Sequence, residues 1–155
     1  MKKLNPEHVK RIIQVINSSP YFLLLSMKVR DLGVGFSKVE IDLDKKHFHP
    51  FGFTHGGVFA SIIDTAAFWA AYYGTEDEDS GMTSVDLKLN YLAPIASGRL
   101  IASGRQIKTG KTLAYAEAEV TEETGKILAH GTSTLMILPG NATALNPPLP
   151  PKFLD

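Results

Sequence analysis

The sequence predicts an α+β fold in which a curved antiparallel sheet wraps around one long central helix. Residues 56–73 form an apolar segment with Asp64 in its middle, and a helix that is apolar on nearly every side must be buried. Two segments that alternate apolar and polar side chains precede this helix, and four follow it. Runs of strands favour an antiparallel sheet with helices on one face, which supplies the cover that the helix needs.

The composition indicates a globular protein with a real core. The 155 residues suit a single domain, and 44% of them are hydrophobic. Sixteen basic residues balance sixteen acidic ones, so neither a nucleic-acid footprint nor a membrane-surface patch is expected. The chain has no cysteine, which excludes disulfides, thiolate zinc sites and a cysteine nucleophile.

The first elements can be placed from local signals. Asn5 as N-cap and Pro6 at the first helical position begin a predicted helix over residues 5–18, followed by strands over residues 28–34 and 37–43. This charged, amphipathic start is unlike a signal peptide, and Asp64 interrupts the longest apolar run. We therefore expect a cytoplasmic protein that does not insert into a membrane.

The second half is predicted to be mostly sheet. The four strands after the central helix are expected over residues 83–92, 99–108, 113–121 and 127–138. One domain should thus span residues 1–138. The proline-rich tail, residues 139–155, is expected to be extended or disordered, because proline cannot join the middle of a sheet.

Two glycines begin the central helix. The first N–H groups of a helix have no internal partner and carry the positive end of its dipole. Gly56 and Gly57 would let a carbonyl oxygen approach these groups, which is how an oxyanion is bound. The alternative is a tight turn and a close contact between helix and sheet.

Asp64 is the second candidate for chemistry. A carboxylate inside an apolar helix is costly without a partner or a water-filled cleft. Such a group can act as a general base or a nucleophile, or it can be a structural aspartate bonded within the core.

The spacing of these two candidates predicts how they are used. Gly57 and Asp64 lie seven residues apart, within about 20° of one helix face but about 10.5 Å apart along the axis. One small reacting carbonyl group cannot contact both. If both act on one carbonyl, we expect each site to combine residues from two chains of a symmetric dimer.

Several motifs resemble one known family. The segment His49-Pro-Phe-Gly-Phe-Thr-His55-Gly56-Gly57, with Asp64 nine residues after His55, is similar to the signature of PaaI-like (phenylacetate-degradation) thioesterases. Residues 84–87, 91–94 and 110–114 are similar to that group as well, and the resemblance covers roughly residues 21–138. It implies the hotdog fold and acyl-CoA thioesterase activity.

The resemblance also implies roles for residues. Asp64 corresponds to the base or nucleophile, and Gly57 to the residue whose backbone N–H polarises the thioester carbonyl. His55 would help to place the thioester, and Ser84, opposite the aspartate, would position water. The family has asparagine where this chain has His49, which offers one donor and one acceptor when neutral and two donors when charged.

Further binding residues follow from the same resemblance. Gly56 is expected at the substrate. Coenzyme A phosphates are expected near a group of residues at the turn between the predicted strands over residues 99–108 and 113–121. The alternative for these side chains is simple solvation. The group comprises Arg105, Lys108, Gly110 and Lys111.

The remaining histidines are expected to be structural or solvated. His47 should be solvated, His8 should lie on the surface of the first helix, and His130 should be a hydrogen-bonded strand residue. The spacing of His47, His49 and His55 fits no zinc pattern, so no metal is expected. No cofactor is expected either, because coenzyme A is part of the substrate.

The predicted function is hydrolysis of an aryl or medium-chain acyl-CoA to the free acid and coenzyme A. Two alternatives remain: an acyl-thioester dehydratase or hydratase on the same fold, and a non-catalytic acyl-CoA-binding module. The expected partners are the acyl-CoA and further copies of the chain, as a dimer that pairs into a tetramer.

Overall fold

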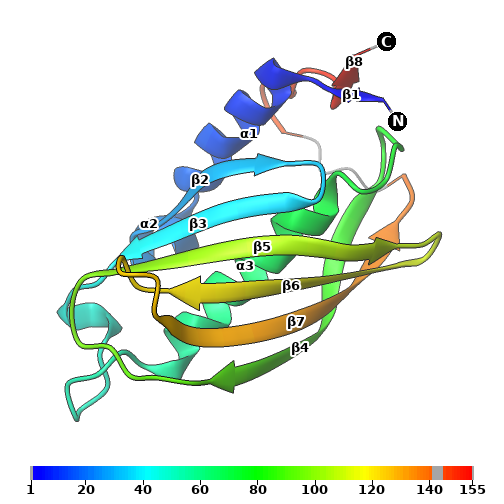
Figure 1. Ribbon diagram of the computed structural model, residues 1–155. Helices are drawn as coiled ribbons and strands as arrows, with labels where there is room; N and C mark the ends of the chain where they lie inside the picture. Colours follow the sequence, from blue (N-terminus) through cyan, green and yellow to red (C-terminus); the bar gives the residue numbers. More distant parts are fainter. Residues whose placement is uncertain (1, 141–144, 155) are drawn as a thin grey trace.

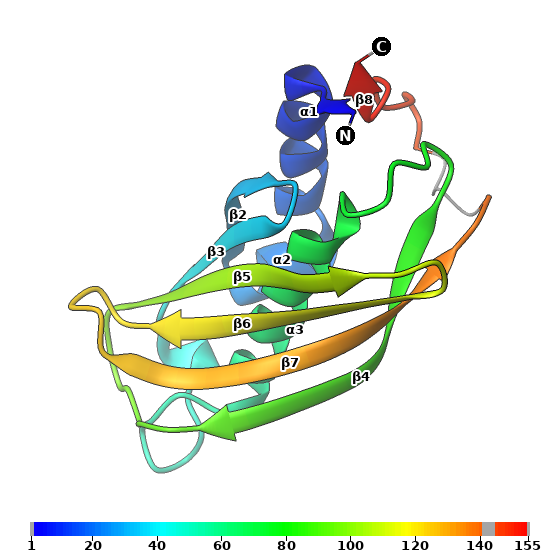
Figure 2. The same cartoon turned by 45° about the vertical axis from the view of Figure 1, so that its right-hand side comes forward.

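The computed structural model, which describes residues 2–140 and 145–154, contains one large antiparallel sheet. A long helix, α3 (Gly56–Tyr72), lies across its concave face (Figures 1 and 2). The predicted fold, a curved antiparallel sheet around a long helix, is confirmed. The strands follow in the spatial order β2 (Met27–Gly33), β3 (Phe36–Asp42), β5 (Arg99–Thr109), β6 (Leu113–Thr121), β7 (Ile127–Leu138) and β4 (Gly81–Tyr91).

Small elements cover one edge of this sheet and join the two ends of the chain. α1 (Pro6–Asn17) packs near β2, and the Asn5 side chain caps it by accepting a hydrogen bond from the Glu7 N–H. The apolar stretch after it forms α2 (Pro20–Leu25), and a short 3₁₀ helix, η1 (Lys45–His47), follows β3. No helix in the described residues is long and apolar enough to cross a membrane.

The proline-rich tail returns to the start of the chain. Residues 145–152 run beside α1, and β8 (Phe153–Leu154) pairs with β1 (Lys3–Leu4) in a two-stranded sheet. Residues 141–144 and 155 of the predicted extended or disordered segment lie outside the described residues. The ends of the described chain therefore lie side by side.

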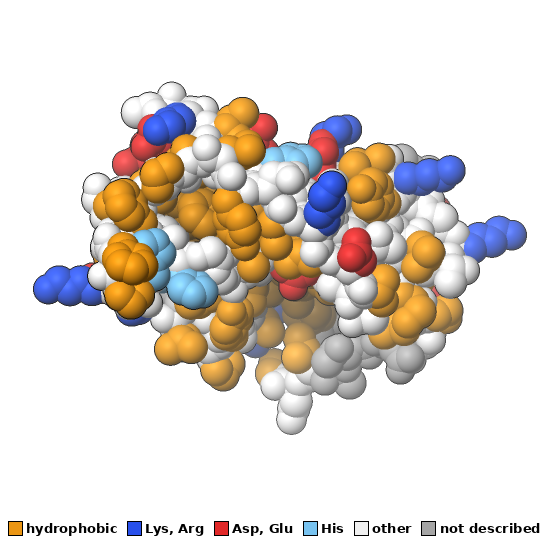
Figure 3. Space-filling view, turned by 90° about the horizontal axis from the view of Figure 1, so that it is seen from below, with side chains coloured by type: hydrophobic (Ala, Val, Ile, Leu, Met, Phe, Trp, Pro, Cys, Tyr) orange, Lys and Arg blue, Asp and Glu red, His pale blue; other side chains and the backbone are white. Residues whose placement is uncertain are grey.

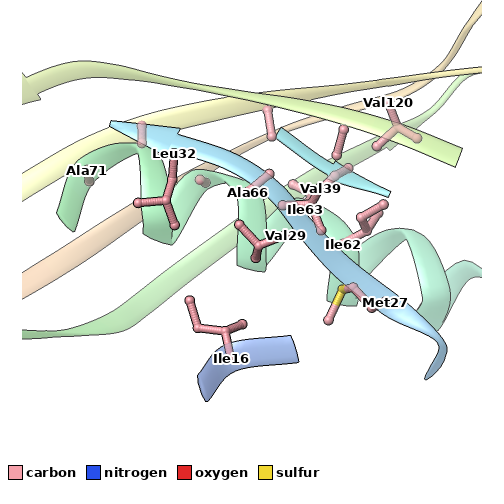
Figure 4. Packing of buried hydrophobic residues seen from close by; sticks show 14 of the residues in the cluster. Ile16, Met27, Val29, Leu32, Val39, Ile62, Ile63, Ala66, Ala71 and Val120 are labelled. Carbon is pink, nitrogen blue, oxygen red and sulfur yellow. The ribbon is translucent and has the colours of Figure 1, made fainter. Parts of the chain in front are cut away.

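Small residues bring α3 close to the sheet. A Cβ atom on Gly104 of β5 would lie 2.2 Å from the Ala66 carbonyl oxygen, so no larger residue fits there. Ser37 of β3 donates a hydrogen bond to that same oxygen at 2.6 Å. Figure 4 shows the apolar side chains that pack around this face of the helix. Because this face is fixed on the sheet, Asp64 on another face stays partly exposed beside β4.

One histidine is buried where the sequence suggested a surface position. His8 is only 2% exposed, because the tail covers α1. Its Nδ1 lies 2.7 Å from the Pro150 carbonyl oxygen, which can only accept, so Nδ1 carries the proton. Its Nε2 is buried with no partner in the described part of the chain. The expectation for His8 is therefore wrong.

Burial of this ring should make stability depend on pH. Desolvation lowers the pKa of His8 below 6.5, so the unfolded chain binds the proton more readily than the folded one. Stability should fall as pH drops from 7 through 6.5 to the lowered pKa, by at most about 1.4 kcal/mol per pH unit. Urea unfolding from pH 8 to 5 should show this slope, and His8→Gln should flatten it. An equal slope in both proteins would assign the titration to another group.

Candidate functional site

The loop before α3 is held by a buried histidine. The ring of His47 is 1% exposed; its Nδ1 accepts the Asp44 N–H at 2.9 Å, and its Nε2 donates to the Leu25 carbonyl oxygen at 2.7 Å. The expectation that His47 is solvated is therefore wrong. The ring ties the loop to the end of α2 and completes a capping box with Asp44. These hydrogen bonds fix the path of the chain towards the α3 N-terminus.

The N-terminus of α3 is capped by His55. Its Nδ1 accepts the Gly57 N–H at 2.8 Å, and its carbonyl oxygen accepts the Val58 N–H at 3.0 Å. The His55 ring is exposed, so a ligand oxygen can reach the Gly57 N–H by displacing it. A Cβ on Gly56 would lie 3.3 Å from the Tyr91 ring, which explains the small residue there.

A pocket of about 410 Å³ adjoins this helix end. His49 lines it, and its Nδ1 accepts the Phe51 N–H at 3.1 Å. In the neutral ring Nε2 then carries the proton, so His49 keeps a donor for a ligand as an asparagine amide would. Figure 3 shows histidine side chains among exposed hydrophobic ones at one end of the molecule. The other lining residues are Phe53, Thr54, Gly56, Phe59, Tyr91, Leu92, Ala93 and Pro94.

Asp64 lies two turns further along α3 and is paired with a hydroxyl. Ser84 Oγ of β4 donates to Asp64 Oδ1 at 2.8 Å, and both residues are partly exposed. No lysine or arginine of the described residues forms an ion pair with Asp64. The carboxylate therefore has one oxygen held by a neutral donor, and its other oxygen makes no hydrogen bond in the described residues.

The expected site residues thus form two clusters within one chain. His49, His55, Gly56 and Gly57 gather at the N-terminus of α3, whereas Asp64 and Ser84 meet at mid-helix. The pocket at the N-terminus is lined by neither member of the second pair. Because α3 is continuous from Gly56 to Tyr72, the rise of about 10.5 Å between Gly57 and Asp64 holds.

The expected phosphate-binding residues lie elsewhere in the chain. They surround the β5–β6 turn, at the opposite end of the sheet from the loop before α3 (Figures 1 and 2). Arg105 donates to Glu117 Oε1 at 2.9 Å, and hydrogen bonds from His130 and Arg105 lower the pKa of the Glu117 carboxyl. Lys108, Gly110 and Lys111 are exposed. Within a single chain, therefore, this turn does not meet the α3 N-terminus.

The sequence did not single out the aromatic wall of the pocket. Tyr91 and Phe59 pack edge to face with ring centroids 6.1 Å apart, and Tyr91 OH donates a long hydrogen bond of 3.4 Å to the Gly56 carbonyl oxygen. Residues 91–94 carry part of the family resemblance, but the sequence assigns no role in the pocket to Tyr91. Among the described residues, no three His, Asp or Glu side chains gather as a metal site.

Comparison with known proteins decides the family. The model of the thioesterase superfamily matches residues 51–129, which include His55, Gly56, Gly57, Asp64 and Ser84 but not His49. The chain belongs to this superfamily. The predicted recognition as a hotdog thioesterase, and with it the assignment as a thioester hydrolase, is confirmed.

Individual relatives of this thioesterase support the same family assignment. Mouse acyl-coenzyme A thioesterase 13 is 29% identical over 132 residues, covering 83% of this chain and 93% of the relative. A 1,4-dihydroxy-2-naphthoyl-CoA hydrolase of Listeria monocytogenes is 26% identical over 113 residues, covering 73% and 91%. A solved thioesterase of Haemophilus influenzae covers 92% of this chain and 99% of its own, with a TM-score of 0.81 at 21% identity, and so shares the fold.

Proposed function

We propose that this thioesterase hydrolyses acyl-CoA thioesters, with Asp64 as the base or nucleophile. The observation that carries the proposal is the Asp64–Ser84 pair: a carboxylate on the central helix that is held by a hydroxyl and has no basic partner in the described residues. Two relatives are named for CoA thioesters, acyl-coenzyme A thioesterase 13 and 1,4-dihydroxy-2-naphthoyl-CoA hydrolase, which supports coenzyme A as the leaving group.

The chemistry requires only water besides the thioester. Ser84 occupies one carboxylate oxygen of Asp64, and the other accepts a proton from water or attacks the carbonyl carbon. The developing oxyanion is stabilised by the Gly57 N–H at a helix N-terminus. If Asp64 acts as the base, the C–S bond breaks after water has added to the carbonyl carbon. If Asp64 is the nucleophile, the C–S bond breaks to leave an acyl–aspartyl anhydride, which water then hydrolyses to the free acid and the carboxylate. On both routes the thiolate of coenzyme A takes up the proton released from water. No cofactor or metal takes part in these steps.

The site requires two chains if both groups act on one carbonyl. About 10.5 Å of helix separates Gly57 from Asp64, which is too far for one reacting atom within a chain. β4, which carries Ser84, is an eleven-residue strand at the sheet edge and so can pair with a second copy. We place Asp64 and Ser84 of one chain opposite Gly57 and His49 of its partner, with coenzyme A extending towards the β5–β6 turn. Dimers of this kind can pair into tetramers.

A panel assay separates this function from its alternatives. The purified chain should release coenzyme A from aryl, short, medium and long acyl-CoAs, as followed by a thiol reagent. Crotonyl-CoA should give no hydration product in the same samples. Binding of acyl-CoA by calorimetry without turnover of any substrate would overturn the proposal in favour of a binding module, and hydration alone would indicate a hydratase.

A further inference from the structure

A second and larger cavity lies at the other end of α3 from the His-Gly-Gly motif. Its volume is about 710 Å³, within the range of pockets that bind small organic ligands. Its walls come from α1, α2, the last turns of α3, the start of β4, the end of β7 and residues 145–152, which we call the strap. Figure 3 shows hydrophobic side chains gathered around a hollow in the lower face of the molecule.

This cavity begins one helix turn beyond the Asp64–Ser84 pair, and neither member of the pair lines it. Phe68 lines it and lies four residues after Asp64, one turn further on the same helix face. Met82 also lines it and lies two residues before Ser84, on the same side of β4, because the irregularity of that strand comes later, between Ser84 and Asp86. Both elements that carry the pair therefore continue into the cavity wall.

The body of the cavity is apolar and its far end is charged. On α3, Trp69 lies between two aromatic neighbours, with ring centroids 5.1 Å from Phe68 and 5.0 Å from Tyr72. Glu78, Asp79 and Lys152 also line the cavity, and Lys152 Nζ lies 4.9 Å from the centroid of the Tyr72 ring. A long apolar group fits this arrangement better than a polar one. The aliphatic wall residues include Ile12, Val15, Ile16, Met82, Leu138, Leu145 and Leu149.

The strap is a fixed wall rather than a loose segment. Asn5 donates to it twice, from its side chain to the Pro151 carbonyl oxygen at 2.9 Å and from its backbone to the Lys152 carbonyl oxygen at 2.8 Å. The Glu78 carboxylate accepts the N–H groups of Lys152 and Phe153 at 2.8 and 2.9 Å. The strap therefore forms a wall of the cavity that is held in place at residues 151–153.

We propose that this cavity binds the acyl chain of the substrate and selects straight fatty acyl groups of medium length. The proposal rests on the proposed acyl-CoA hydrolysis. From Asp64 to Tyr72 the axis of α3 rises by about 12 Å, the length of an extended chain of roughly ten carbon atoms. Each methylene that enters should raise kcat/KM by about fourfold, until the chain reaches the charged end.

A substitution that fills the cavity tests the proposal. Val15→Phe adds a ring to the cavity from α1, whereas Gln14→Phe adds the same ring to the exposed face of that helix as a matched control. The ratio of kcat/KM for decanoyl-CoA to that for butyryl-CoA should fall at least tenfold in Val15→Phe and stay within twofold in Gln14→Phe. An unchanged ratio in folded Val15→Phe would overturn the proposal.

A substitution in the strap gives the opposite shift. Leu149→Ala enlarges the cavity, so the chain length with the highest kcat/KM should increase by two or more carbons. The optimum should stay in place if the strap has no contact with the acyl chain, and that result would contradict the proposal even if Val15→Phe does not fold.

A binding readout separates this proposal from the proposed function. Trp69 is the only tryptophan of the chain and lines the cavity, so its fluorescence reports an occupant. Decyl-CoA, a thioether that cannot be hydrolysed, should change this fluorescence, with weaker binding to Val15→Phe. Hydrolysis of decanoyl-CoA without a fluorescence change would overturn the cavity assignment alone, whereas a change without hydrolysis of any acyl-CoA would overturn the proposed function alone.

Discussion

Asp64→Asn should lower kcat for acyl-CoA hydrolysis by about 10³-fold, with little change in stability. The amide has nearly the size of the carboxylate, and its oxygen can still accept the Ser84 hydroxyl, which donates to Asp64 Oδ1 at 2.8 Å. What the substitution removes is the negative oxygen that takes a proton from water or attacks the carbonyl. Steady-state kinetics on the best acyl-CoA of the panel, beside urea unfolding, measures both quantities.

Two further variants make this result specific. Asp86→Asn removes an exposed carboxylate from the same strand as Ser84 and should leave kcat within twofold. Ser84→Ala removes the donor to Asp64 but keeps the carboxylate, so kcat should fall by less than in Asp64→Asn. If Asp64→Asn retained the kcat of the unsubstituted protein, the assignment of Asp64 would be wrong.

The sheet and the central helix could be predicted because their signals are local. Alternation in β6 places Ala114, Ala116 and Ala118 on the buried side and Tyr115 outside, as the period of two requires. The apolar pattern of residues 56–73 corresponds to a helix whose buried side lies against the concave face of the sheet, whereas its other side stays partly exposed within one chain. The motif at residues 49–57 and Asp64 locates two clusters but does not tell how far apart they lie in an assembly.

The errors concern residues whose partners are distant in sequence or are backbone atoms. His47 donates to Leu25, 22 residues away, and His8 donates to Pro150, 142 residues away. Neither carbonyl oxygen leaves a mark in the sequence. The same holds for the strap, since a proline-rich composition predicts an extended chain but not the bonds from Asn5 that hold it on α1. The cavity at that place could therefore not be foreseen.

A site shared between two chains leads to a second strong prediction: two variants that are inactive alone should regain activity when they form a heterodimer. Gly57→Pro deletes the N–H proposed to bind the oxyanion, and proline is tolerated in the first turn of a helix. Like Asp64→Asn, it should be inactive alone. In a heterodimer of the two variants, the site that combines the intact Asp64 with the intact Gly57 should function. The other site should not.

Heterodimers can be isolated by giving each variant a different affinity tag and purifying over both columns. They should show about half of the activity of the unsubstituted dimer, since one of two equivalent sites remains. An Asp64→Asn homodimer that carries the same two tags is the matched control and should remain inactive. A folded heterodimer without activity would show that both groups of each site come from one chain. The same conclusion would follow if light scattering showed that the fully active protein is a monomer. The helix spacing argues against that outcome, because the rise of about 10.5 Å between Gly57 and Asp64 exceeds the reach of one thioester carbonyl.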